Sequence, residues 1–305
     1  MPARAYQASG LSAPGAIPRL AVVCLLAAAA GGVVEGLVSR WLSLLLLFPL
    51  LLGGIVGFAA GRVIAGSHVR APWMAALVAG VAGLFAQLAV HAVQYVEFRY
   101  ELGQQLAAAQ PGVDGAGAGA VVDQILQQET GQAGFAGYLQ FRAKLGTEIK
   151  KAGHSSGIKL EGAAFWVLFA VNFLLAGGIA ASSAFGRANA PYCEPCQRWY
   201  EQHQHVASGS ADKSAVAGTL RALDAGVVTE VPAVFGAAKP DGVAVLQLLR
   251  CAGCSDHEPQ LSLTVITGPA KKQKTKNAYK SMLRPDEARS LLGAFAASPA
   301  QKQPG

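Results

Sequence analysis

The sequence predicts a membrane α-helical bundle of four transmembrane helices, followed by a small α+β domain toward the C-terminus. The first observation behind this prediction is composition. Apolar residues make up 52% of the 305-residue chain and charged residues only 14%, against roughly a quarter in soluble domains. The second observation is the distribution of the apolar residues, which are concentrated in long runs. The third is that four of the five cysteines follow the last run, in two C-x2-C pairs.

The apolar runs divide the chain into five predicted segments. These are a disordered lead over 1–18, three transmembrane helices over 19–95, an extramembrane loop with amphipathic helices over 96–162, a fourth transmembrane helix over 163–185, and a soluble domain over 186–305. A hydrocarbon core about 30 Å thick needs about twenty apolar residues per helix, which these runs supply. The first run also resembles a cleaved signal peptide, which stays open as an alternative.

The loop between the third and fourth runs has its own helical signals. We expect residues 98–109 to continue the third helix beyond the bilayer and 121–128 to form a short helix. Apolar residues at helical spacing predict an amphipathic helix over 135–149. We interpret 153–162 as loop.

Glycines recur every four residues in the second run, at Gly53, Gly57 and Gly61. This spacing places them on one helix face, where the missing side chains let a neighbouring helix approach closely. We expect them to pack against another helix of the same chain or to support self-association.

Polar residues interrupt the third and fourth runs at Gln87, His91 and Asn172. Gln87 and His91 lie one turn apart and share a helix face. Polar groups inside a membrane are costly and often functional. Two interpretations follow: a hydrogen-bonded stripe between helices, or a path for a proton, an ion or a substrate.

The tail carries the signals of a compact α+β domain. We expect a helix between Asp212 and Gly226, strands over 243–249 and 261–265, and a last helix beginning at Pro285. The lysine-rich run 271–280 is interpreted as a solvated hairpin tip, with contacts to anionic headgroups or nucleic acid as alternatives.

The two cysteine pairs are Cys193-Glu-Pro-Cys196 and Cys251-Ala-Gly-Cys254. Four thiolates in this spacing suit one Zn²⁺ ion. A metal-free remnant and a dithiol redox site remain as alternatives. Covalent haem does not fit, because no histidine directly follows either pair. The fifth cysteine, Cys24, lies in an apolar run and is expected to be an inert buried thiol.

Residues 193–264 resemble a zinc ribbon of the rubredoxin-like kind, in which two C-x2-C knuckles clasp one metal. The resemblance implies a small zinc-ribbon-like domain with a closed structural Zn²⁺ site. Gln197 and Ser255 follow the pairs at positions where that family commonly has glycine. The whole arrangement also resembles multi-span bacterial membrane proteins that end in a cysteine-paired domain.

The leading functional hypothesis is an integral protein of the inner (plasma) membrane with both termini in the cytoplasm. Four spans put both termini on one side, and the reducing cytosol keeps thiolates available as ligands. The expected partners are the lipid bilayer and another protein or a second copy. The net charge of +7 is too mild for a nucleic-acid binder, and no nucleophile–base set indicates catalysis. A transporter or channel component and a membrane thiol–disulfide oxidoreductase are the alternatives.

Overall fold

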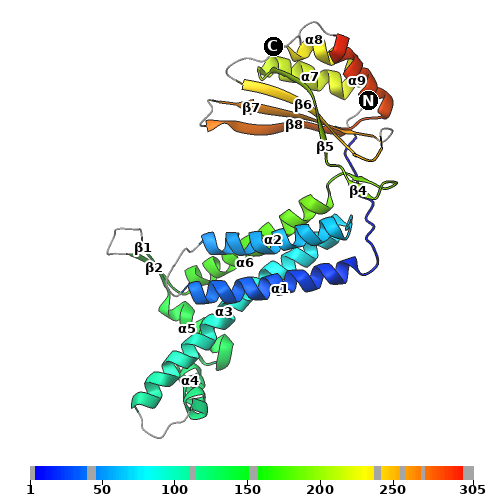
Figure 1. The fold of residues 1–305 in the computed structure, drawn as a ribbon. Helices are drawn as coiled ribbons and strands as arrows, with labels where there is room; N and C mark the ends of the chain where they lie inside the picture. Colours follow the sequence, from blue (N-terminus) through cyan, green and yellow to red (C-terminus); the bar gives the residue numbers. More distant parts are fainter. Residues whose placement is uncertain are drawn as a thin grey trace. The chain divides into compact units, whose positions relative to one another are not determined.

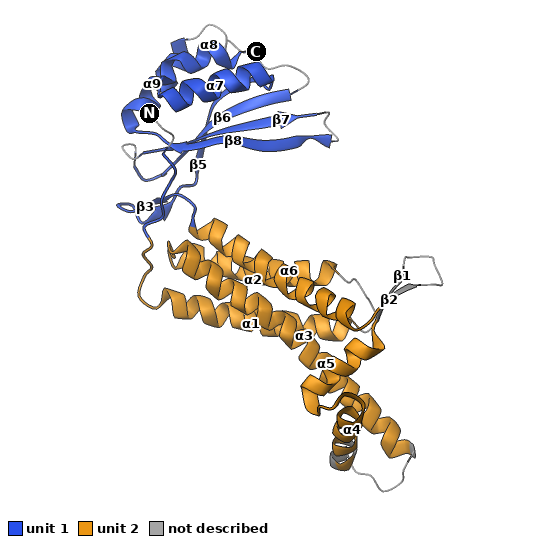
Figure 2. Ribbon diagram, turned by 180° about the vertical axis from the view of Figure 1, so that it is seen from behind, with its two compact units in different colours: residues 1–9, 189–305 blue, residues 10–188 orange. Residues whose placement is uncertain are grey.

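The computed structural model describes residues 4–39, 46–109, 115–150, 157–236, 242–254, 258–268 and 272–297. The chain forms two compact units (Figures 1 and 2). Unit 1 combines residues 1–9 with 189–305, and unit 2 holds residues 10–188. The cysteine pairs therefore belong to a unit that includes the start of the chain.

Four long helices form the body of unit 2: α1 (Ala16–Val38), α2 (Leu47–Gly66), α3 (Pro72–Ala109) and α6 (Ala163–Ala188). Each is long and apolar enough to cross a membrane, so the four predicted runs are helices. Residues 42–45 of the predicted second run lie outside the described residues. The 38 residues of α3 measure about 57 Å at 1.5 Å per residue. As expected, α3 thus continues well past the length a bilayer needs.

The four helices pack through small residues that bring their backbones together. A Cβ atom added to Gly53 of α2 would lie 2.6 Å from the carbonyl oxygen of Ala176 in α6, and one added to Gly83 of α3 would lie 2.7 Å from the same oxygen. Helices α2 and α3 therefore both touch α6 at one carbonyl. Gly32 of α1 is equally close to α3, where its Cβ would lie 2.6 Å from the Ala86 oxygen.

The predicted glycine stripe of α2 splits into two kinds of position. Gly53 and Gly57 both lie against α6, and a Cβ on Gly57 would meet the Ser183 side chain at 2.7 Å. Gly61 has open space, with nothing within 4 Å of its added Cβ. Gly53 and Gly57 thus support packing between helices of the same chain.

Large apolar side chains such as Phe58 and Leu174 point outward and are about 70% exposed.

The segment between α3 and α6 folds onto the extension of α3. It comprises α4 (Gly115–Thr130), α5 (Gly134–Leu145) and the antiparallel pair β1 (Thr147–Lys150) and β2 (Gly157–Leu160). Val122, Leu126 and Tyr138 form a small core against aromatic residues of α3. The Arg99 guanidinium of α3 lies 3.0 Å from the Asp123 carboxylate of α4.

Two expectations for this segment are wrong. The helix predicted over 135–149 ends at Leu145, because Gly146 adopts a φ of 75° that an α-helix cannot continue. Residues 147–150 form strand β1 instead. The stretch interpreted as a loop over 153–162 contains the partner strand β2. Strands of only four residues are too short to show a recognisable alternation of apolar and polar side chains in the sequence.

Unit 1 is an antiparallel sheet with helices on one face (Figure 1). Its strands are, in spatial order, β5 (Gln202–Ser210), β6 (Gly242–Arg250), β7 (Gln260–Thr267) and β8 (Lys274–Met282). The helices are α7 (Lys213–Ala225), the 3-10 turn η1 (Val228–Glu230), α8 (Val231–Phe235) and α9 (Pro285–Ala297). Leu246, Leu263 and Leu291 are fully buried between the layers. A two-stranded ribbon, β3 (Tyr192–Cys193) with β4 (Arg198–Trp199), precedes the sheet.

The expected tail elements are present, with two corrections. Helix α7 follows Asp212 and ends at Gly226, and α9 begins at Pro285. The lysine-rich run is only in part a hairpin tip: Lys272 lies in the connection between β7 and β8, whereas Lys274 and Lys280 lie in strand β8. The N-terminal lead also differs from the expected disordered segment: the Arg4 carbonyl accepts a hydrogen bond from the Met282 N–H, and α1 begins at residue 16.

Gly53 and Gly61 offer a matched test of backbone packing in α2. Substitution Gly53→Ala places a methyl group against the Ala176 carbonyl and should lower the stability of the helical unit by about 1–3 kcal/mol. Gly61→Ala meets open space and should be neutral or slightly stabilising, because alanine is the better helix former. Thermal unfolding of the detergent-solubilised protein measures both. Equal effects of the two variants would contradict the packing described here.

Candidate metal centre

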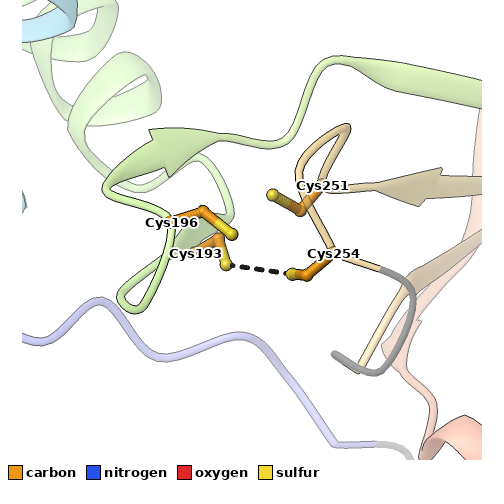
Figure 3. Close-up of side chains that lie close together, drawn as sticks. All are labelled: Cys193, Cys196, Cys251 and Cys254. Atoms are coloured by element: carbon orange, nitrogen blue, oxygen red, sulfur yellow. Dashed lines mark hydrogen bonds between the residues drawn. The ribbon is translucent and has the colours of Figure 1, made fainter.

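The two cysteine pairs converge in unit 1 (Figure 3). The sulfur atoms of Cys193, Cys196, Cys251 and Cys254 all lie within 4.8 Å of one another. Cys193 Sγ and Cys254 Sγ are 3.5 Å apart. All five cysteines fall in the described part of the chain and are free thiols. For comparison, a tetrahedral Zn²⁺ with ligands at 2.3 Å separates its sulfurs by about 3.8 Å.

The first pair is shaped by the β3–β4 ribbon. Cys193 ends β3, opposite Arg198, and the chain turns back through Cys196. Gln197 closes this turn with a φ of 51°, and its N–H donates to the Glu194 carbonyl at 3.3 Å. Gln197 therefore adopts the left-handed conformation that favours glycine. The ribbon is made without the glycine that the zinc-ribbon resemblance leads one to expect.

The second pair forms where β6 ends. Cys251 directly follows this strand, and the Gly253 N–H donates to the Cys251 sulfur at 3.4 Å. A Cβ on Gly253 would lie 3.2 Å from the Cys196 sulfur, so a side chain here would crowd the centre. Glycine at this position lets the two turns approach each other.

The four sulfurs sit at the edge of the fold. Cys193 is 1% exposed and Cys251 5%, whereas Cys196 and Cys254 are half-buried. Tyr192 and Trp199 back the ribbon with their ring centroids 5.0 Å apart. Two ligand atoms are thus shielded from water and two remain partly accessible.

The electrostatics of the cluster favour a cation. Burial raises the pKa of the Cys193 thiol and of the Cys254 thiol. Burial also acts to raise the pKa of Cys251, but hydrogen bonds from the Gly253 N–H and the other cysteines outweigh it and lower that pKa. The nearby Tyr200 phenol has a raised pKa because of burial and the negative charge of the thiolates. Several thiolates this close together need a positive ion to stabilise them, and soft sulfur ligands suit Zn²⁺, Cu⁺ or iron.

The predicted intramembrane polar residues gather along the α3–α6 contact. The His91 ring stacks on Phe169 and Phe173 of α6, at centroid distances of 4.8 and 6.1 Å, and these phenylalanines flank Asn172 in sequence. Gln87 is 2% exposed. Each of these three polar residues has one buried side-chain atom without a hydrogen-bond partner among the described residues: Gln87 Oε1, His91 Nε2 and Asn172 Oδ1.

Several residues around these sites were not singled out from the sequence. The Gln94 amide joins His91 to the end of α1: its Oε1 lies 3.3 Å from His91 Nδ1, and its Nε2 donates to Ser39 Oγ at 3.1 Å. The spacing of Gln94 three residues after His91 was a usable signal. Tyr200 and Glu258 lie beside the cysteines and bond to each other, the Tyr200 hydroxyl donating to the Glu258 carbonyl at 3.0 Å. No sequence pattern marked that contact.

Comparisons of this chain with protein families, with curated proteins and with solved structures found no match. The cysteine cluster is therefore interpreted from its geometry and donor set. These show a centre with four sulfur ligands that could hold one metal ion.

Metal affinity of this centre should depend steeply on pH. Burial keeps Cys193 and Cys254 protonated at neutral pH in the free protein, so an ion that binds as a thiolate complex must displace protons. Affinity should therefore fall as the pH is lowered, by at least about tenfold per pH unit. Competition with a chromophoric chelator between pH 6 and pH 8 measures this dependence. A flat profile would show that the ion binds elsewhere.

Proposed function

We propose that this chain is a multi-pass protein of the inner (plasma) membrane whose cysteine unit binds one structural Zn²⁺ and serves assembly or protein–protein contact. The observation that carries the proposal is the convergence of four free sulfurs within 4.8 Å. The zinc-ribbon resemblance of residues 193–264 points to the same ion.

The donor set favours a structural role for the ion. Four protein thiolates complete the tetrahedral coordination of Zn²⁺ and leave no position for water or substrate. Catalytic zinc sites keep one position open. The ion would instead join the β3–β4 ribbon to the β6–β7 turn and stabilise unit 1.

Membrane insertion is supported by the exposed faces of the helices. The outward side chains of α1, α2, α3 and α6 include many large apolar residues, among them Leu26, Phe58 and Leu174. Such faces are unfavourable in water and suit a hydrocarbon environment. The cytoplasmic side is favoured for unit 1 because thiolates persist there as ligands.

The bilayer and one protein partner are the interactions that this proposal requires. Gly53 and Gly57 are already used against α6, so they are not available for self-association. Gly61 alone of the three has free space on its side of α2. We therefore place the protein–protein contact on unit 1 and not on the glycine stripe.

The proposal predicts about one zinc per chain in the full-length protein purified in detergent without chelators. Cys193→Ser and Cys254→Ser should each lose the ion, because three sulfurs leave the coordination incomplete. Cys24→Ser is the matched control, since Cys24 is buried in α1 and is not a member of the cluster, and this variant should retain the metal. Elemental analysis gives the stoichiometry.

The same preparations separate the zinc proposal from a thiol oxidoreductase. With zinc bound, both cysteine pairs should stay protected from an alkylating reagent until a chelator is added. Reversible disulfide formation in metal-free, active protein would instead support redox chemistry.

A second candidate function is transport or conduction through the polar cluster of α3 and α6. It is favoured by the three buried polar atoms without a partner at Gln87, His91 and Asn172, since such atoms are costly inside a membrane unless a ligand or water satisfies them. This candidate is independent of the metal centre.

Substitution His91→Leu tests the second candidate. Leucine preserves apolar packing against Phe169 and removes both ring nitrogens, so a transport role predicts loss of function with normal membrane insertion. Phe169→Leu is a control that keeps the nitrogens and alters only the stacking. An unchanged growth phenotype and unchanged ion flux in His91→Leu would end the transport hypothesis.

A further inference from the structure

The first described residues of the chain lie on the free edge of strand β8. The Arg4 N–H donates to Ser281 Oγ at 2.9 Å, and the Met282 N–H donates to the Arg4 carbonyl at 2.8 Å. Ser281 and Met282 end β8, whose opposite edge is paired with β7. One main-chain hydrogen bond and one bond to a serine side chain thus join this segment to the end of β8.

The Arg4 side chain is held by two carboxylates. Its guanidinium lies 3.1 Å from Glu258 Oε1 and 3.8 Å from Glu287 Oε2. Glu287 is only 15% exposed, whereas Glu258 and Arg4 are nearly half-exposed. Exposed ion pairs contribute little on their own. The bonds of the Arg4 main chain to Met282 and to the Ser281 side chain therefore position the segment. Glu258 is the nearer carboxylate for the guanidinium, since Glu287 is also bonded by Arg284.

The site for Arg4 is connected to both cysteine pairs. The Tyr200 hydroxyl donates to the Glu258 carbonyl at 3.0 Å. Tyr200 stands four residues after Cys196, and Glu258 four residues after Cys254. One hydrogen bond thus ties together the segments that leave the two pairs, and Arg4 binds the side chain of the same Glu258.

The N-terminal segment also forms one wall of a cavity that reaches the cluster. The cavity has a volume of about 690 Å³ and is lined by Arg4, Tyr6, Gln7, Cys193, Glu194 and Tyr200, among others. Residues 4–7 and Cys193 therefore line the same cavity.

We propose that the β8 edge, with Glu258 and Glu287, is a binding site for an arginine-bearing extended segment, that residues 4–9 are its ligand within this chain, and that this binding is coupled to the metal. The coupling rests on the proposed zinc centre. The ion holds the two segments that position Tyr200 and Glu258, so its loss removes one carboxylate from the Arg4 site. Linkage is reciprocal, so the docked segment slows the loss of the ion. Residues 10–15 connect this segment to α1.

Limited trypsin digestion of the full-length protein in detergent tests the metal dependence of docking. The bond after Arg4 is protected while the segment lies on the β8 edge. Chelation of zinc should accelerate cleavage at this bond at least about tenfold over the zinc-loaded protein, as read by intact mass. Cleavage after Lys213, exposed at the start of α7, reports on unfolding of unit 1 and should change less. Equal rates at Arg4 with and without zinc would overturn the proposal.

Zinc release tests the reverse direction. Arg4→Ala should release zinc to a chromophoric chelator about three- to tenfold faster than the unaltered protein. Arg289→Ala is the matched control: it also removes an arginine from unit 1, but Arg289 bonds only to the Pro285 carbonyl among the contacts described, and its release rate should not change. If chelation accelerates cleavage at Lys213 and at Arg4 equally, the trypsin assay does not separate undocking from unfolding, and the zinc-release rate is then the deciding measurement. A release rate in Arg4→Ala equal to that of the unaltered protein would overturn the coupling.

The two failures are distinguishable. A protein that binds zinc with the expected stoichiometry but shows neither effect contradicts the coupling and leaves the zinc centre intact. A protein that binds no zinc contradicts the centre itself, and the metal-dependent docking with it.

Discussion

Four sulfur atoms lie within 4.8 Å of one another in unit 1 and bring two distant segments of the chain together. As thiolates these sulfurs would repel one another, and a divalent ion shared by all four would cross-link the two segments that carry them. Cys193 and Cys254 are 61 positions apart, so the link closes a long loop. Structural zinc binding contributes about 10–16 kcal/mol in small zinc domains, as large as the whole stability of a typical domain at about 5–15 kcal/mol. The hydrogen bond from the Tyr200 hydroxyl to the Glu258 carbonyl also joins the segments that follow the two cysteine pairs.

The helical unit depends on a different constraint, the closeness of backbones. Gly53 of α2 and Gly83 of α3 both contact the Ala176 carbonyl, so α6 is the helix on which its neighbours converge. Dispersion contacts between backbones replace the hydrophobic effect as a driving force when helices pack in lipid. These contacts need small residues at fixed positions: Gly53 occupies such a position, whereas Gly61 has open space around it.

The features that the sequence predicted correctly are those encoded locally. Hydropathy over about twenty residues is sufficient to find α1, α2, α3 and α6, and C-x2-C spacing is sufficient to find the four sulfurs. Features that depend on distant partners were missed. The docking of Arg4 on β8 joins residues 277 positions apart, and no local pattern marks either side. Strand β8 was also missed, because its lysines and exposed polar residues hide the apolar alternation that identifies a strand.

The docking of Arg4 also bears on how many times the chain crosses the membrane. Arg4 and Met282 share a hydrogen bond, so the segments before α1 and after α6 must lie on one side of any membrane that the helices span. The number of crossings between them is therefore even, and the four apolar helices satisfy this condition. Removal of the first run as a signal peptide would take Arg4 away with it, and leave the β8 edge and its two carboxylates without their ligand. Retention of the first run is therefore the alternative in which Arg4 keeps its contacts with Ser281 and Met282.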